Sequence, residues 1–243
     1  MIGEEPLFSD AGIFAREQQE RAVSELLRDI GNDPPRRIAY LQTGPWTTRE
    51  RLELRFPGAE VSPLDLSRLD GPTSRFARNE VDLIYCDGDL ELLPLLPDLL
   101  PKLADRLRFG GRLAAHFPDN LYEPNRVLAR MVAADGPWAK QLLPIAKTRP
   151  FGQTMEELYA RLRPVYALVD IWETVHLCVM SGVGVIVDFM KTTSLAPYLA
   201  PLDETLRKAF LNRFVTELTQ AYPPQPDGAV LLRFPRICVL TRR

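Results

Sequence analysis

The stretch VDLIYCDGD, residues 81–89, decides the fold. Residues 81–86 form an apolar run interrupted only by Asp82, and two acids around a glycine follow it directly. A nearly continuous apolar run of this length is typical of a strand in a parallel sheet, where both faces are covered. Because ligands of such sheets bind beyond the carboxyl ends of the strands, we expect Asp87 and Asp89 to lie beside a binding site.

Segments on both sides of this strand extend it into a sheet. Residues 37–41, 59–64 and 112–117 are predicted strands, and residues 109–111 (FGG) a turn. Helices are predicted over 11–30, from about residue 48, and over 90–107, the last with an irregular, proline-rich start. This alternation indicates an α/β fold with a parallel sheet. Its strand ends are 42–47, 65, 87–89 and 118–120.

The second half of the chain has a different pattern. Helices are predicted over 120–134, 155–162, 186–192 and 206–221, and strands over 166–175 and 228–241, the latter kinked at Pro235. Two strands separated by helices would close the sheet. We therefore expect residues 1–243 to form a single domain in which helices within 120–165 and 177–225 cap the strand ends.

Composition excludes several classes of protein. The chain of 243 residues has 46% hydrophobic residues, 26% charged residues and a formal net charge of −2, which does not favour nucleic-acid binding. No apolar window is long enough to span a bilayer, and the start lacks the features of a signal peptide, so we expect a cytoplasmic protein. Three widely spaced cysteines and two histidines predict no metal site.

Several runs, in order along the chain, resemble the trans-aconitate methyltransferase family: VDLIYCDGD (81–89), FPDNLYEP (117–124), DGPW (135–138), VDIWETVH (169–176), FMKTTSLAPYL (189–199), AYPPQPDG (221–228) and LLRFPRICVLTRR (231–243). The resemblance implies a Rossmann-like, seven-stranded methyltransferase fold with a helical cap. It also implies S-adenosylmethionine (SAM) as the cofactor and the carboxylate of a small organic acid as the group methylated.

The resemblance is weakest where SAM would bind. The family's loop after the first strand has an acid followed by glycines at alternate positions, as in DLGCGPG, and these glycines let the backbone approach the cofactor. In this chain the acid is replaced by Tyr40, and two glycines are replaced by Gln42 and Trp46. The remnants of the cofactor site would be Thr43, Gly44, Pro45, Asp65 and Asp87.

Two further departures affect the same site. Only 16 residues separate Asp65 from Asp82, where the family has a helix, a third strand and an acid that contacts adenine. Sixteen residues barely provide one helix and one strand with their turns, so we expect part of the adenine wall to be missing. The family's ERTRP-like run is EQQER here, residues 17–21. For Asp65, a ribose contact and ordinary turn chemistry both remain open.

The expected substrate side is also altered. The family's GLRP run is SLAP here, so Ala196 replaces an arginine of the type that holds a carboxylate in two parallel hydrogen bonds. Other polar residues remain as candidate anion contacts under the cap: Asn120, Arg149, Lys191, Tyr198 and Arg236. For Arg236, an ion pair with a local acid is an equally good interpretation.

Candidate catalytic residues are few. Asp87 could contact a ligand, act in acid–base chemistry or cap the following helix. His116 could act as a general base at a strand end, or it could be a buried histidine with structural hydrogen bonds. The closeness of Asp87 to Asp89 resembles an acid–base pair, but exposed acids in turns are common.

Three functions follow from these patterns. The first is a pseudo-methyltransferase with an eroded SAM site, acting as a binding or partner subunit for a small carboxylate or a protein. The second is a divergent SAM-dependent O-methyltransferase, since methyl transfer to a carboxylate depends mostly on proximity and orientation. The third is cofactor-independent chemistry on the same fold, using His116 or Asp87.

Overall fold

The strand predicted at residues 81–86 is β3 (Val81–Asp87), and it lies between two parallel neighbours, β1 (Arg37–Gln42) and β4 (Leu107–Pro118). The short strand β2 (Glu60–Pro63) pairs with β1, also in parallel. The four predicted parallel strands are therefore confirmed. The computed structural model describes residues 17, 20–21, 23–28, 30, 34–42, 48–64, 79–88, 95–147 and 154–243.

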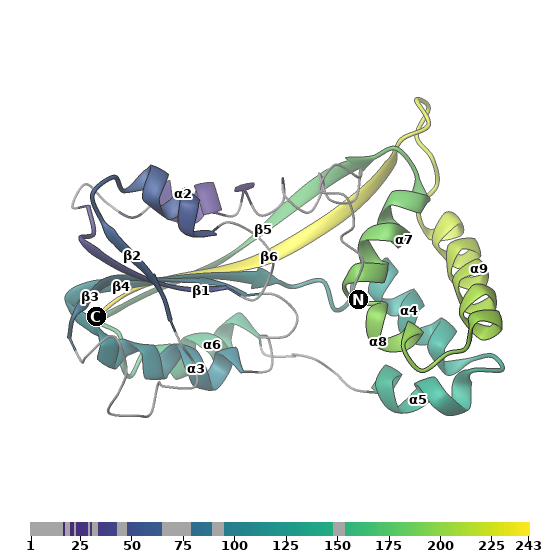
Figure 1. Ribbon diagram of the computed structural model, residues 1–243, viewed down its shortest axis with the longest axis horizontal. Coiled ribbons are helices and arrows are strands. Elements are labelled where there is room, and N and C mark those ends of the chain that lie inside the picture. Colours follow the sequence, from purple (N-terminus) through teal and green to yellow (C-terminus); the bar gives the residue numbers. More distant parts are fainter. Residues whose placement is uncertain are drawn as a thin grey trace. The chain divides into compact units, whose positions relative to one another are not determined.

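The complete sheet of the described residues has six strands in the order β2-β1-β3-β4-β6-β5 (Figure 1). Strands β5 (Leu168–Met180) and β6 (Val230–Arg242) are both longer than predicted. β6 runs antiparallel to β4, so the expectation of a purely parallel sheet is wrong at this end. The seventh strand expected from the resemblance would fall within residues 65–78, which lie outside the described residues.

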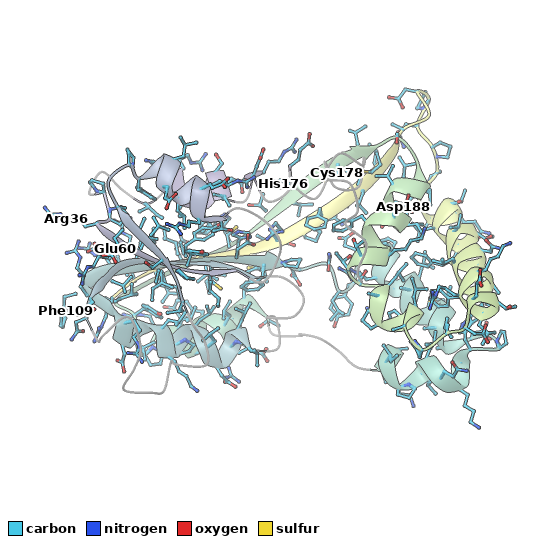
Figure 2. The ribbon with its side chains drawn as sticks, in the orientation of Figure 1. Arg36, Glu60, Phe109, His176, Cys178 and Asp188 are labelled. Carbon is cyan, nitrogen blue, oxygen red and sulfur yellow. The ribbon has the colours of Figure 1, made fainter. Side chains whose placement is uncertain are left out.

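The turn predicted at residues 109–111 is instead a bulge inside β4. The pairing of β4 with β3 shifts register between Val81 and Leu83, and Gly110 has φ +76°, a value that side chains rarely tolerate. A Cβ on Gly111 would lie 2.9 Å from the carbonyl oxygen of Arg108. The two glycines therefore let the strand bend without ending, and the exposed Phe109 projects outward beside them (Figure 2).

Two compact units divide the described residues. We call the first the sheet unit; it contains the described residues of Glu20–Pro118, Gln153–Thr174 and Arg236–Arg243. We call the second the helical unit; it contains those of Asp119–Gly152 and Val175–Pro235.

Helices cover both faces of the sheet within the sheet unit (Figure 1). Helical residues 23–28 and α2 (Thr48–Arg55) bury apolar side chains against β1 and β3 on one face, including Leu26, Leu52 and Ile38. On the other face lie α3 (Leu96–Lys102), continued by the 3₁₀ helix η2 (Leu103–Arg106), and α6 (Met155–Leu162). Proline is tolerated in the first turn of α3, and residues 90–94, where the irregular start was predicted, lie outside the described residues.

Helix α6 belongs to the sheet unit although the sequence assigned it to the cap. Its limits are those predicted, and a capping box between Thr154 and Glu157 fixes its start. An ion pair of 2.7 Å joins Arg161 to Asp98 of α3. The hydroxyl of Tyr166, just after the helix, donates a hydrogen bond to the carbonyl oxygen of Leu100 at 2.7 Å.

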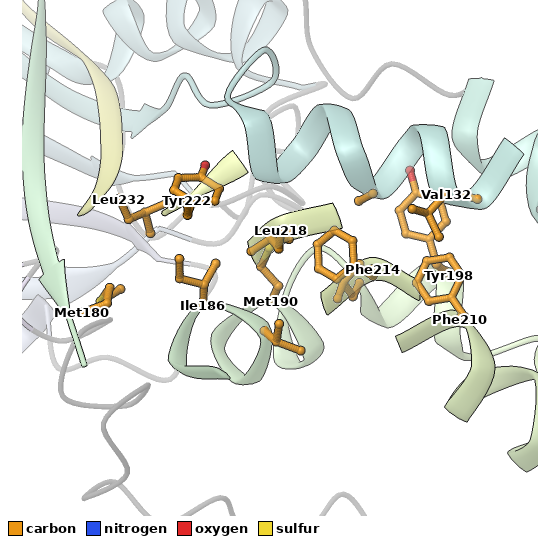
Figure 3. Close-up of a cluster of buried hydrophobic side chains, with 14 of the residues drawn as sticks. Val132, Met180, Ile186, Met190, Tyr198, Phe210, Phe214, Leu218, Tyr222 and Leu232 are labelled. Atoms are coloured by element: carbon orange, nitrogen blue, oxygen red, sulfur yellow. The ribbon is translucent and has the colours of Figure 1, made fainter. Parts of the chain in front are cut away.

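The helical unit contains five helices around one core: α4 (Pro124–Ala134), α5 (Ala139–Lys147), α7 (Val183–Thr192), α8 (Ala196–Leu199) and α9 (Glu204–Ala221). Phe210 and Phe214 of α9 are fully buried and stack with an interplanar angle of 18° (Figure 3). Trp138 packs edge-on against Phe210 and donates a hydrogen bond to the carbonyl oxygen of Val132. Helices α5 and α8 were not predicted, because both are short and contain proline.

The predicted placement of these helices as a cap in a single domain stays a prediction.

No helix among the described residues is both long and apolar enough to cross a membrane.

Candidate functional site

The chain order of the sheet locates one position where a ligand is expected. From β1 the chain proceeds to β2 on one side, and the next described strand, β3, lies on the other side. The carboxyl ends of β1 and β3 lie side by side, where Gln42 pairs with Asp87 in the parallel register. In open α/β sheets, ligands bind beyond such a switch point.

Asp87 is buried at this switch point, with 6% of its surface exposed. The hydroxyl of Thr48, the first residue of α2, donates a hydrogen bond of 3.3 Å to one carboxylate oxygen. The other oxygen lies 3.4 Å from Nε2 of His116 and 3.8 Å from a guanidinium nitrogen of Arg236. We call Thr48, Tyr85, Asp87, His116 and Arg236 the strand-end network.

His116 is fully buried, and the charge of its neighbour defines its tautomer. The guanidinium of Arg236 contacts Nδ1 of His116, and because arginine can only donate, Nδ1 must be the acceptor. The ring proton is therefore on Nε2, which donates a hydrogen bond of 2.7 Å to the hydroxyl oxygen of Tyr85. Burial, and then the positive charge of Arg236, lower the pKa of His116 well below its usual value, so the ring is neutral.

Tyr85 and Arg236 both keep their protons. Burial, and then the negative charge of Asp87, raise the pKa of Tyr85 well above its usual value. Burial lowers the pKa of Arg236, and the carboxylate of Asp87 opposes that shift. The network is thus a neutral histidine and a tyrosine enclosed between one anion and one cation.

This geometry bears on the predicted roles of Asp87 and His116. The described helix α3 begins after Leu95 with no side-chain cap, so Asp87 does not cap α3; residues 89–94, where the predicted helix would begin, lie outside the described residues, and the capping role stays a prediction. The lone pair that His116 would need as a base faces Arg236. The catalytic roles of both residues stay predictions, with no free acceptor on the imidazole among the described contacts.

The predicted anion contacts fall into different parts of the chain. Asn120 and Tyr198 are buried in the helical unit. Lys191 is also there, and it forms an ion pair of 2.8 Å with Asp188. Arg236 belongs to the sheet unit, where it contacts Asp87, as one of the two open interpretations had it.

Other predicted site residues lie outside the described residues. They are Thr43, Gly44, Pro45, Asp65 and Arg149, together with Trp46 and Asp89. Of the remnant SAM contacts, only Asp87 is described, and its carboxylate oxygens face Thr48, His116 and Arg236. The described part of the chain contains no cluster of three histidine, cysteine or acidic side chains that could hold a metal ion.

Sequence reasoning missed three polar residues of these regions. Tyr85 reads as an ordinary apolar strand residue, although strand alternation places it on the same face as Asp87. Arg126 and Arg130 stand four residues apart in α4, so they share one face of a helix whose other residues are mostly apolar. This spacing of two like charges is the feature of the sequence that could have identified the pair.

Comparison with curated proteins shows the family. Trans-aconitate 2-methyltransferases from Methylobacterium radiotolerans and Yersinia pestis are 37% and 34% identical to this chain. The matches cover 93% and 92% of this chain and 94% and 93% of those proteins. No family model matches the chain. A solved structure of a putative methyltransferase from Bacillus halodurans aligns with a TM-score of 0.52 at 12% identity, covering 90% of this chain and 97% of that one.

The Methylobacterium alignment also gives the number of aligned positions at which this chain has no residue. It extends over 245 positions but includes 93% of the 243 residues, about 226, so this chain has no residue at about 19 positions.

Proposed function

Because the chain belongs to the trans-aconitate 2-methyltransferase family, we propose that it retains the family's fold to bind a small carboxylate and no longer binds SAM. It would act as a binding protein or as the partner subunit of a complex. In the terms of its family it is a pseudo-methyltransferase.

One observation supports this proposal above the others. Gln42 ends β1 at the switch point, directly opposite Asp87, where a bound nucleotide must approach the backbone closely. The sequence there has Gln42 and Trp46 at positions where the family has glycine. Glycine has no side chain and lets the backbone approach a ligand closely, so its replacement at these two positions disfavours a bound cofactor and restricts the loop conformations that present N–H groups.

The length of the chain supports the same proposal. About 19 positions of the Methylobacterium relative have no counterpart here, and only 16 residues separate Asp65 from Asp82. Losing two or three hydrogen bonds to the cofactor at about 1.5–3 kcal/mol each would weaken a micromolar ligand by about a hundredfold or more.

A divergent SAM-dependent carboxyl O-methyltransferase is the second candidate. Its support is the 34–37% identity to trans-aconitate 2-methyltransferases over nearly the whole chain. Such an enzyme needs orientation of its two substrates more than a catalytic side chain, so the neutral His116 is no objection to it.

Calorimetry with SAM and with S-adenosylhomocysteine separates the two candidates. We expect no measurable heat, or a Kd near the millimolar range, under conditions in which the Methylobacterium relative binds. The double variant Gln42→Gly/Trp46→Gly should bind little better, because the adenine wall is not restored. A low-micromolar Kd for SAM, or methyl ester formation from trans-aconitate, would replace the proposal with the second candidate.

A further inference from the structure

Two arginines share one face of α4 without an acid between them. Arg126 and Arg130 are one helical turn apart, and like charges at this spacing destabilise a helix. The first turn of α4 contains no acidic residue, although acids are favoured at this positive end of a helix dipole. The arrangement concentrates positive charge at a place where the fold itself gains nothing from it.

Within the described part of the chain, the guanidinium of Arg126 has no hydrogen-bond acceptor. Its Nε is buried and unpaired, and among the described residues its side chain forms no hydrogen bond or ion pair. Burial, opposed by the charge of Tyr198 and aided by that of Arg130, lowers the pKa of Arg126 to about 10. The side chain as a whole is partly buried. Cations taken out of water are normally paired, so an anion bound here would supply the acceptor that the described residues do not.

The neighbours of this guanidinium are a second cation and a phenol. Arg130 donates one hydrogen bond to the carbonyl oxygen of Leu121 at 2.8 Å, which holds its guanidinium in place. Tyr198 of α8 interacts electrostatically with both arginines, and in Figure 3 its hydroxyl is directed toward α4. Burial raises the pKa of Tyr198, so its hydroxyl keeps a proton to donate.

A second unpaired polar atom lies in the segment that leads into α8. The buried hydroxyl oxygen of Ser194, four residues before Tyr198, has no hydrogen-bond partner among the residues that the structure describes. Native structures contain few such groups, and a ligand is one reason for them.

We propose that Arg126, Arg130 and Tyr198 form the binding site for a carboxylate group of a small organic acid, a proposal that rests on the carboxylate-binding function proposed above. Arg126 offers the planar pair of donors that matches a carboxylate. Arg130 adds charge, and Tyr198 adds a neutral donor.

The start of α4 favours a carboxylate over a phosphate. Phosphates at helix N-termini are held by free backbone N–H groups. Here the N–H of Asn125 donates to the hydroxyl of Tyr222, and that of Arg126 donates to the side-chain oxygen of Asn125. The N–H of Val127 donates to the carbonyl oxygen of Glu123. Side-chain donors therefore remain as the contacts for an anion, and they suit a planar acid.

Titration calorimetry with trans-aconitate, tricarballylate and inorganic phosphate tests the site on the full chain. We expect the organic acids to bind and Arg126→Met to weaken them at least tenfold, because a hydrogen bond to a charged group is lost. Arg126→Lys, which keeps the charge but not the paired donors, should weaken them less. Arg213→Met is the matched control, since this arginine of the same unit already pairs with Asp135 at 2.6 Å.

The outcomes separate this inference from the proposed function. Unchanged affinity in Arg126→Met, with the organic acids still bound, would overturn the site but not carboxylate binding. Equal or tighter binding of phosphate, lost in Arg126→Met, would overturn the carboxylate assignment. Tight SAM binding would overturn the pseudo-methyltransferase alone. Unaltered circular dichroism and Tm of the unliganded variant establish that it folds.

Discussion

The strand-end network and the Arg126–Arg130 pair both take arginine charge out of water, but they do so in opposite ways. In the sheet unit, Arg236 faces a carboxylate and an imidazole acceptor, and each member of the network has a partner. In the helical unit, Arg126 has none among the described residues. A closed network stabilises the fold, whereas an open one is useful only when something else binds. The predictions below test that distinction.

The largest effect is expected where the closed network is opened. Asp87→Asn removes the anion that faces buried Arg236, and breaking a buried pair in this way should lower the free energy of unfolding by about 3 kcal/mol. Urea denaturation measures it. The matched control is Asp98→Asn, which breaks the exposed ion pair with Arg161 in the same unit and should cost about 1 kcal/mol or less. Equal losses would mean that the network is not structural.

The second effect depends on pH and concerns His116. Its folded pKa lies below the unfolded value of about 6.5, so below that pH the unfolded chain binds a proton that the folded protein does not. Stability should therefore be full above about pH 6.5 and fall below it by up to about 1.4 kcal/mol per pH unit. Burial is the main cause of the lowered pKa, and the positive charge of Arg236 adds to it. Asp87 and Tyr85 are the other polar groups that face the ring.

Urea denaturation between pH 7.5 and 5.5 measures this slope, and His116→Gln should reduce it. NMR of the wild-type protein checks the same point without a variant, because the chain has two histidines and the ring of His116 should not titrate in this range. A titration of the His116 ring in this range would contradict the neutral, enclosed histidine.

The third effect has the opposite sign and belongs to the open pair. Arg126→Met removes an unpaired, partly buried cation and its repulsion from Arg130, so the unliganded protein should become more stable by about 1 kcal/mol. Thermal and urea unfolding measure the change. Arg213→Met, which loses an exposed ion pair, should be neutral or slightly destabilising. A clear loss of stability in Arg126→Met would show that Arg126 is structural.

The smallest effect is expected at Tyr198. Its hydroxyl forms no hydrogen bond with the described residues, so Tyr198→Phe should change the free energy of unfolding by less than about 0.5 kcal/mol while weakening carboxylate binding. Tyr166→Phe gives the contrast, because it leaves the buried carbonyl of Leu100 without its donor and should cost about 1–3 kcal/mol. The measurement is urea unfolding of both variants side by side.

The sheet could be predicted from the sequence because its strands are continuous apolar runs with strong local signals. The bulge at Gly110 could not, since a glycine pair indicates a turn as readily as a bend within a strand. The antiparallel direction of β6 depends on how a distant segment pairs with β4, which no local pattern contains.

The candidate sites were predictable only residue by residue. His116 and Asp87 stood out as isolated polar residues at strand ends, but their enclosure with Tyr85 and Arg236 follows from register across three strands. The spacing of Arg126 and Arg130 is visible in the sequence, but only the structure shows that the guanidinium of Arg126 has no acceptor among the described residues.

Strand β6 has a consequence for how the chain folds during synthesis. It runs without interruption from Leu232, which is buried in the core of the helical unit, to Val239, which is fully buried and pairs with Ala115 of β4. The hydrophobic side chains of both units can therefore be fully covered only after the same late segment, residues 230–242, has been synthesised. A nascent chain that ends before residue 230 exposes apolar surface from both units at once, and this interval on the ribosome is where we expect chaperones to be needed most.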